Sequence, residues 1–249
     1  MSDNAPINSS TPGTSRFATT HWSVILAAGC PESPGYRQAL QTLCQTYWFP
    51  LYAYLRRRGY DRHQAEDSTQ AFFASLLERQ GIARADPEQG KFRSFLLASL
   101  KNFLADEWDR AQAQKRGGDI KVFSLNIEDA ETWYSAEPAD NLSPEKLFEK
   151  SWALTVLKQA MAQLKAEFVA ANKQQLFNHL KAYLTAEPGS VPYRQVAARL
   201  DMTEGAVKVS VHRLRQRYRE LVRQQIAQTV STADEVDAEI RDLFAALAS

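Results

Sequence analysis

The stretch VPYRQVAARLDMTEGAVKVSVHRLRQRYR, residues 191–219, says most about the fold of this chain. Its apolar residues recur every three or four positions, which is the spacing of one face of an α-helix. Two such runs flank Asp201 and Met202, and the hydroxyl group of Thr203 is suited to cap the second helix. Small residues on both sides of the turn allow the two helices to approach closely. The stretch therefore predicts a helix-turn-helix, whose second helix enters the major groove of DNA.

The charge of the second helix supports this interpretation. Between residues 204 and 223, six Lys or Arg residues stand against two Glu residues, whereas residues 231–249 carry five acidic residues and one Arg. The net charge of +1 for the whole chain hides this contrast. An ordinary solvated basic helix is the alternative. The coincidence of cap, turn, small residues and charge favours DNA binding.

The rest of the sequence has the period of helices and no convincing run with the period of a strand, which predicts an all-α protein. A long helix is expected over 91–116, where basic and aromatic residues alternate as in proteins that bind single-stranded nucleic acid. Most of these rings fit a hydrophobic core equally well. Asp61 and Gln64 form a capping-box pattern at the start of another helix. Further helices are expected over 144–167, 172–186, 192–200, 204–228 and 234–248.

Changes in composition divide the chain into two helical domains joined by a linker. The expected units are a tail over 1–16, a first domain over 17–116, an acidic linker over 117–143, a second domain with the helix-turn-helix over 144–228, and an acidic amphipathic C-terminal helix over 229–249. For the C-terminal helix, packing on the second domain is favoured over folding across the basic helix.

Composition and motifs argue against an enzyme, a metal site and a membrane protein. The chain is 44% hydrophobic and 24% charged, as in soluble globular proteins. Its four His residues are scattered, and neither a Gly-rich phosphate loop nor a GxSxG sequence is present. Cys30 and Cys44 form neither a metal-spaced pair nor a disulfide framework, which indicates a reducing compartment. With no targeting or membrane segment, we expect a cytoplasmic protein without cofactor or metal.

Two further stretches precede the helix-turn-helix, AEDSTQAFFASLLERQ at 65–80 and FRSFLLASLKNFLADEWDR at 92–110. In order and spacing, the three stretches resemble the small, two-domain extracytoplasmic-function (ECF) sigma factors of bacterial RNA polymerase, over roughly 36–116 and 144–225. The resemblance implies that the first stretch binds core polymerase, the second melts and reads the −10 element, and the helix-turn-helix reads the −35 element. It also raises the alternative that the helix over 91–116 is two helices with a loop near 100–104.

The resemblance assigns roles to particular residues. It implies polymerase binding by Asp67, Gln70 and Phe73, binding of the −10 element by Lys101, Asn102, Arg110, Lys115 and Arg116, and binding of the −35 element by Thr203, Lys208, Ser210, His212, Arg213, Arg215 and Arg217. An Arg at position 213 can bind guanine with two hydrogen bonds. Arg215 and Arg217 are better suited to phosphates. Alternatively, Asp67 and Gln70 belong to an ordinary solvated helix face, and Asn102 is a cap or turn residue.

The sequence departs from the family in the docking helix and in the −10-reading helix. Ala71 stands where the family usually has an acid, and the basic run that often closes the −10-reading helix is thinned at 111–114. These differences weigh against promoter melting more than against polymerase docking.

The sequence as a whole predicts a sigma factor whose partners are core RNA polymerase and promoter DNA. An anti-sigma factor and an autoinhibitory C-terminal helix are further candidate partners. Two alternatives remain open. One is a helix-turn-helix regulator that binds DNA without polymerase and uses residues 17–116 for dimerisation or sensing. The other is a helical adaptor that never touches DNA.

Overall fold

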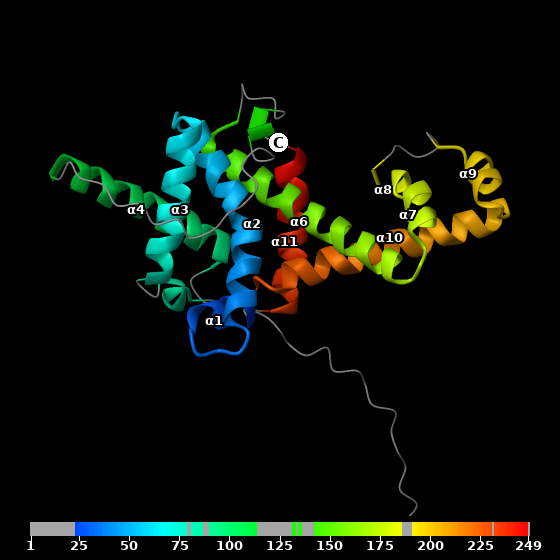
Figure 1. The fold of residues 1–249 in the computed structure, drawn as a ribbon, viewed down its shortest axis with the longest axis horizontal. Helices are drawn as coiled ribbons and strands as arrows, with labels where there is room; N and C mark the ends of the chain where they lie inside the picture. Colours follow the sequence, from blue (N-terminus) through cyan, green and yellow to red (C-terminus); the bar gives the residue numbers. More distant parts are fainter. Residues whose placement is uncertain are drawn as a thin grey trace, which may run out of the picture.

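The computed structural model describes residues 23–78, 81–86, 90–113, 131–132, 134–135, 142–185, 191–230 and 232–248. Within these residues every regular element is helical, as the sequence predicts (Figure 1). The expected tail over 1–16 and most of the expected linker over 117–143 lie outside the described residues.

The helices follow one another along the chain close to their expected ranges. They are α1 (Ser23–Gly29), α2 (Tyr36–Arg57), α3 (Arg62–Glu78), the 3₁₀ turn η1 (Gly81–Arg84), α4 (Phe92–Ala113), α6 (Pro144–Ala170), α7 (Gln174–Leu180), α8 (Ala182–Thr185), α9 (Tyr193–Leu200), α10 (Glu204–Ala227) and α11 (Ala233–Ala248). The segment expected as one helix over 172–186 is two short helices, because Lys181 forms a turn between α7 and α8.

Helix α4 is continuous, so the alternative of two helices with a loop near 100–104 is wrong. Phe92, Leu96 and Leu100 are all buried at 1% exposure or less. Their spacing of four residues places them on one face of a single helix. Burial of that face stabilises the helix through the point where the resemblance suggested a break.

Two of the long helices, α3 and α6, begin at the capping residues that the sequence predicts. Before α3, the backbone N–H of Gln64 donates to Asp61 Oδ1 at 2.8 Å, and the backbone N–H of Asp61 donates to Gln64 Oε1 at 3.1 Å. This is the reciprocal geometry of a capping box. At α6, Ser143 Oγ accepts from the backbone N–H of Lys146 at 3.2 Å, and Pro144 occupies the first helical position.

Helix α2 is the central element of the first part of the chain. Residues 51–55 are five consecutive residues with at most 1% exposure, so the helix is covered on every side. It packs against α1, α3, α4 and α6, and in Figure 1 it lies between α3 and α6. Pro50 lies inside α2 without ending it.

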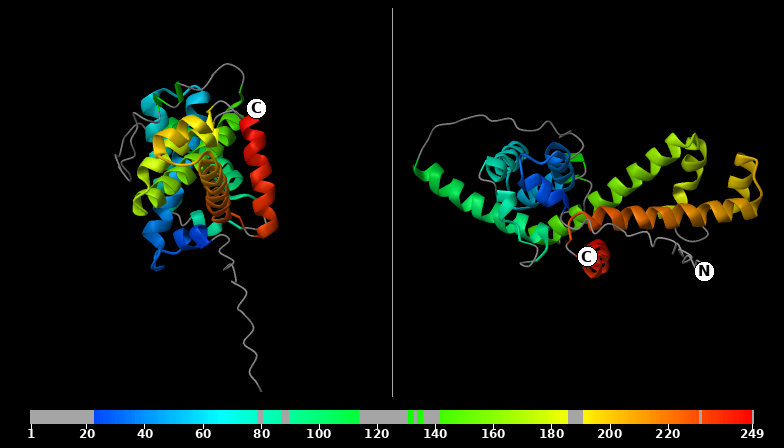
Figure 2. Two further views of the ribbon diagram at one scale, coloured as in Figure 1. Left: turned by 90° about the vertical axis from the view of Figure 1, so that its right-hand side faces the viewer. Right: turned by 90° about the horizontal axis from the view of Figure 1, so that it is seen from below.

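Helix α6 connects the first part of the chain to the second. Its first half packs along α2, where Phe148 and Trp152 are at most 1% exposed, and its second half pairs with α10. In Figure 2 the two long helices run side by side away from α2–α4. The hydroxyl group of Tyr218 in α10 donates to the carbonyl of Leu157 in α6 at 3.1 Å. The buried residues thus form one connected core, while the division into two domains stays a prediction.

The C-terminal helix α11 packs against α6 and α10, the arrangement that the sequence favours. Val236 and Leu243 face this contact and are buried. In Figure 2 the helix lies beside the bundle and crosses the direction of α10. Its side chains also reach the beginning of α4, which the sequence does not indicate.

The contact between α2 and α6 makes Trp152 a residue on which stability depends. We expect Trp152→Ala to lower the free energy of unfolding by about 3–5 kcal/mol, because it removes a large buried ring and leaves a cavity. Urea denaturation followed by circular dichroism measures this change. Val169→Ala, at a position 44% exposed in the same helix, is the matched control and should change stability by about 0.5 kcal/mol or less. Equal effects of the two variants would contradict the packing described here.

Candidate nucleic-acid interface

The helix-turn-helix is built by α9, a tight turn and the first half of α10. Asp201 has a positive φ of 50° and ends α9, and the backbone N–H of Met202 donates to the carbonyl of Ala197 at 3.0 Å. Thr203 then caps α10, accepting from the backbone N–H of Ala206 at 3.2 Å. Val196, Ala197, Val207, Val211 and Leu214 are buried in this unit. The sequence therefore predicted both the turn and its cap correctly.

The outer side of α10 carries a group of exposed side chains. They are Lys208, Val209, His212 and Arg213. The Lys208 ammonium group pairs with Glu204 Oε1 at 2.8 Å and lies 5.5 Å from the ring centre of Tyr193, which positions it at the start of the helix. This pair lowers the pKa of Glu204 through the hydrogen bond from Lys208. Helices α6 and α10 together form an arm, and the end of this arm that carries the exposed face lies far from α4 in Figure 1.

Val209 is a member of this face that the sequence argument missed. It is 50% exposed and lies between Lys208 and Ser210 in the first turns of α10. An apolar side chain on a helix in the major groove can contact the methyl group of thymine. The sequence did contain a sign of its exposure. Val209 lies two positions from each of the apolar residues Val207 and Val211, so it cannot share their buried face of the helix.

Three of the residues predicted to bind the −35 element are engaged inside the protein. The Ser210 hydroxyl donates to the carbonyl of Ala206 at 2.8 Å. Arg215 donates from Nε and Nη2 to the carbonyl of Tyr183 at 3.2 and 2.9 Å, and Arg217 pairs with Glu167 of α6 at 2.7 Å. Arg215 and Arg217 therefore tie α10 to α8 and α6. Their contact with DNA phosphates stays a prediction, and these bonds compete with it.

The residues predicted to bind polymerase lie on α3 but differ in exposure. Asp67 is exposed, whereas Gln70 is half-buried and donates to Glu66 Oε1 at 3.3 Å. Phe73 is 4% exposed and belongs to the core. Its burial does not support direct contact of this ring with a partner, since Phe73 instead fixes the position of α3.

The residues predicted to bind the −10 element lie on α4 or beyond it. Lys101 and Asn102 are exposed, and Lys101 pairs with Glu145 of α6 at 2.8 Å and lies 5.8 Å from the ring centre of Tyr54. The backbone of Arg110 is part of α4. Lys115 and Arg116 lie outside the described residues.

Lys91, just before α4, and Arg93, in its first turn, are paired with carboxylates of the protein itself. Lys91 and Arg93 contributed to the basic character that the sequence assigns to this helix, but both contact carboxylates of α11. Arg93 is only 4% exposed and also pairs with Glu149 of α6 at 2.6 Å. The basic surface of α4 is therefore smaller than the sequence indicates.

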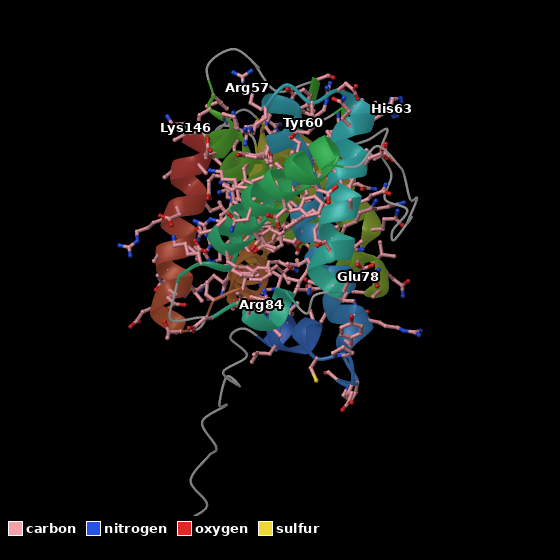
Figure 3. The ribbon with its side chains drawn as sticks, turned by 90° about the vertical axis from the view of Figure 1, so that its left-hand side faces the viewer. Arg57, Tyr60, His63, Glu78, Arg84 and Lys146 are labelled. Carbon is pink, nitrogen blue, oxygen red and sulfur yellow. The ribbon has the colours of Figure 1, made fainter. Side chains whose placement is uncertain are left out.

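The end of α2 is a basic edge that contains Arg56 and Arg57. In Figure 3, Arg57 and Tyr60 lie at one end of the molecule between Lys146 on one side and His63 on the other, whereas Arg84 lies toward the opposite end. Arg57 donates to the carbonyl of Leu142 at 2.7 Å. Close by, Arg56 pairs with Glu131 at 2.7 Å.

Comparisons with known proteins agree with this arrangement. Residues 45–114, which contain most of α2 and all of α3 and α4, match the family model "Sigma-70 region 2". The chain is also 25% identical over 183 residues to the ECF RNA polymerase sigma factor SigE of Mycolicibacterium smegmatis. Over these residues the chain is similar to the ECF sigma factors. This confirms the resemblance seen in the sequence, and neither match is to an enzyme.

The extent of these matches is limited. The alignment with the ECF sigma factor SigE covers 74% of this chain and 61% of the relative, so the chain spans about three fifths of that protein. No solved structure matches the chain. Among the described residues, no helix is long and apolar enough to cross a membrane.

The internal bonds of Arg215 distinguish it from Arg213 on the same helix. We expect Arg215→Ala to lower the free energy of unfolding by about 1–3 kcal/mol, because the half-buried guanidinium group is lost and the Tyr183 carbonyl is left without its donor. Arg213→Ala, at an exposed position two residues away, is the matched control with an expected change of about 0.5 kcal/mol or less. Thermal unfolding of both variants measures the difference. A larger loss for Arg213→Ala would show that the bonds to Tyr183 contribute little.

Proposed function

We propose that this protein is an initiation factor that binds core RNA polymerase in the cytoplasm and directs it to promoters. The observation that carries the proposal is the match of residues 45–114 to sigma-70 region 2, on a chain that also contains a helix-turn-helix. The relative that the chain matches is named as an RNA polymerase sigma factor. A regulator that acts without polymerase would not need a region 2.

The first group of helices supplies the proposed contacts with polymerase and the −10 element. Asp67 projects from α3, and Lys101 and Asn102 project from α4. A carboxylate on a helix surface can pair with basic groups of a partner. An ammonium group and an amide can hold a phosphate and the edge of an unpaired base. Promoter opening in this scheme requires capture of unpaired bases and no covalent chemistry.

The exposed face of α10 supplies the proposed contact with the −35 element. Lys208, His212 and Arg213 carry the polar groups of this face, and Val209 adds an apolar one. An Arg that binds guanine and a Val that contacts a thymine methyl group would read sequence, whereas Lys208 can neutralise a phosphate. A helix-turn-helix regulator that acts without polymerase would use the same face of α10. The two functions therefore differ in whether α3 binds polymerase.

A reconstituted transcription assay tests the proposal directly. Purified protein, core polymerase from the same source and genomic promoter fragments should yield specific transcripts only when all three are present. Asp67→Arg should reduce these transcripts by at least about tenfold by repelling the docking surface, while Arg84→Glu, an exposed charge reversal at the other end of the same group of helices, should not. Binding to palindromic DNA without any binding to core polymerase would favour the regulator instead.

A variant at Arg213 tests the reading of the −35 element. We expect Arg213→Ala to weaken binding to the preferred sequence by about 1–3 kcal/mol and to relax selection at one base pair, because a bidentate contact with guanine would be lost. Selection from a randomised −35 library, followed by binding measurements at several salt concentrations, provides the test. Uniform weakening on all sequences with a shallower salt dependence would assign Arg213 to a phosphate.

A further inference from the structure

Two side chains near the end of α2 hold a carboxylate that comes from a distant part of the chain. Arg56 donates to Glu131 from Nη2 to Oε1 at 2.7 Å and from Nε to Oε2 at 3.2 Å. The hydroxyl group of Tyr52 donates to the same Oε2. The Arg56 guanidinium group also lies over the ring of Tyr134, 4.9 Å from its centre. We call Tyr52 and Arg56 the α2 socket.

The α2 socket is built by the first group of helices, whereas its occupant is not. Tyr52 and Arg56 lie within residues 45–114, the range that matches sigma-70 region 2, and Glu131 lies outside that range. Tyr52 is fully buried and stacks on Trp48 at 5.2 Å between ring centres. Arg56 also donates from Nη1 to the carbonyl of Tyr60 at 2.9 Å. The donors are therefore positioned by α2 and the residue that follows it closely, and not by Glu131 alone.

The donors of the α2 socket suit a phosphate group as well as a carboxylate. A guanidinium group that donates two hydrogen bonds binds both anions with the same fork geometry. Burial acts to lower the pKa of Arg56, but the hydrogen bond and the charge of Glu131 outweigh this effect, so the pKa is raised. Without an anion, the partly buried guanidinium group and the buried hydroxyl group would lose their partners, which is unfavourable. An anion that replaces Glu131 would satisfy both.

The α2 socket adjoins the surface that we propose for the −10 element. Arg58, two residues after Arg56, donates to the hydroxyl group of Tyr54 at 3.4 Å. Lys101 of α4 lies 5.8 Å from the centre of the same Tyr54 ring. Arg56, Arg58 and Lys101 thus gather at the same end of α2. Phosphates recur at each nucleotide of a DNA strand, so a strand held at Lys101 can present further phosphates to this end of α2.

The contact made by Glu131 is small enough to be exchanged. The side chains of Arg56 and Glu131 are 20% and 23% exposed, and the neighbouring residues Thr132 and Ser135 are exposed. Partly exposed ion pairs of this kind contribute little to stability. A phosphate can make the same hydrogen bonds, and a strand that also contacts Arg58 and Lys101 gains interactions that Glu131 does not have.

We propose that the α2 socket binds a backbone phosphate of the promoter strand at the −10 element, and that Glu131 occupies the socket until this strand displaces it. The inference rests on the proposed function, because promoter DNA is the ligand. A phosphate contact carries no sequence information, so the socket contributes to affinity and not to selection. Glu131 acts as a competitor within the chain, which a strand already held at Lys101 overcomes more readily than a strand that meets Arg56 alone.

Glu131→Gln tests the proposal, because it removes the competing charge and keeps the size of the side chain. Binding of fluorescein-labelled oligothymidine to the whole chain is measured by fluorescence anisotropy at several salt concentrations. The variant should bind at least about threefold more tightly than the original chain. The slope of log Kobs against log salt should become steeper by about 0.7, because one more phosphate of a single strand is neutralised.

Glu78→Gln is the matched control, since it changes the net charge by the same amount. Glu78 is exposed at the last residue of α3, away from Arg57, Tyr60 and His63 in Figure 3. This variant should keep the affinity and the salt dependence of the original chain.

Two further variants assign the gain to the α2 socket. In the Glu131→Gln background, Arg56→Gln should abolish the gain in affinity and the steeper salt dependence. Tyr52→Phe removes only the hydroxyl group and keeps the buried ring, so in the same background it should reduce the gain. Circular dichroism of each variant shows that it is folded, and Tyr52→Phe keeps the test decisive if Arg56→Gln does not fold.

The outcomes separate this inference from the proposed function. Equal affinity and salt dependence of Glu131→Gln and the original chain would overturn the inference and make Glu131 a permanent anchor. A gain that persists in full with both Arg56→Gln and Tyr52→Phe would also overturn it, because the extra contact would then lie elsewhere. Absence of promoter-directed transcription by the original chain, with the gain from Glu131→Gln intact, would instead overturn the proposed function and leave a phosphate site on α2.

Discussion

Arg93 places a full positive charge where almost no water reaches it. Burial by itself acts to lower the pKa of this guanidinium group, but Glu239 and Glu149 outweigh that effect and the pKa is raised overall. A buried charge without such partners would cost several kcal/mol. Because the two carboxylates come from α6 and α11, the positions of α4, α6 and α11 depend on one another. The arm that carries the helix-turn-helix begins with the part of α6 that contains Glu149, so the direction of the arm also depends on Arg93.

Features set by neighbours in the sequence were predictable. The caps formed by Asp61 with Gln64 and by Thr203 involve residues three positions apart, and the periodicity of Phe92, Leu96 and Leu100 is that of one helix. For α4 the residue pattern was a better guide than the resemblance, which suggested a break. The turn of the helix-turn-helix was predictable for the same reason, since its small and capping residues act locally.

Features set by distant partners were not predictable. Arg93 and Arg217 look like other basic residues in the sequence. Arg93, however, pairs with Glu149 and Glu239, which are 56 and 146 positions away, and Arg217 pairs with Glu167, which is 50 positions away. The sequence shows that Arg93 and Arg217 are charged, but it does not show which carboxylate pairs with each of them. One signal was present: Arg93 precedes Leu96 by three residues and Leu100 by seven, which places it on the buried face of α4. A charge on an apolar face requires a partner, and the acidic C-terminal helix had carboxylates to supply.

The two proposed DNA-binding surfaces are not equally available in this structure. His212 and Arg213 project from the end of the arm, whereas Lys208 is paired with Glu204 and Lys101 is paired with Glu145. That pair is about half exposed on both sides, and exposed ion pairs contribute about 1 kcal/mol or less, so a DNA phosphate can displace Glu145.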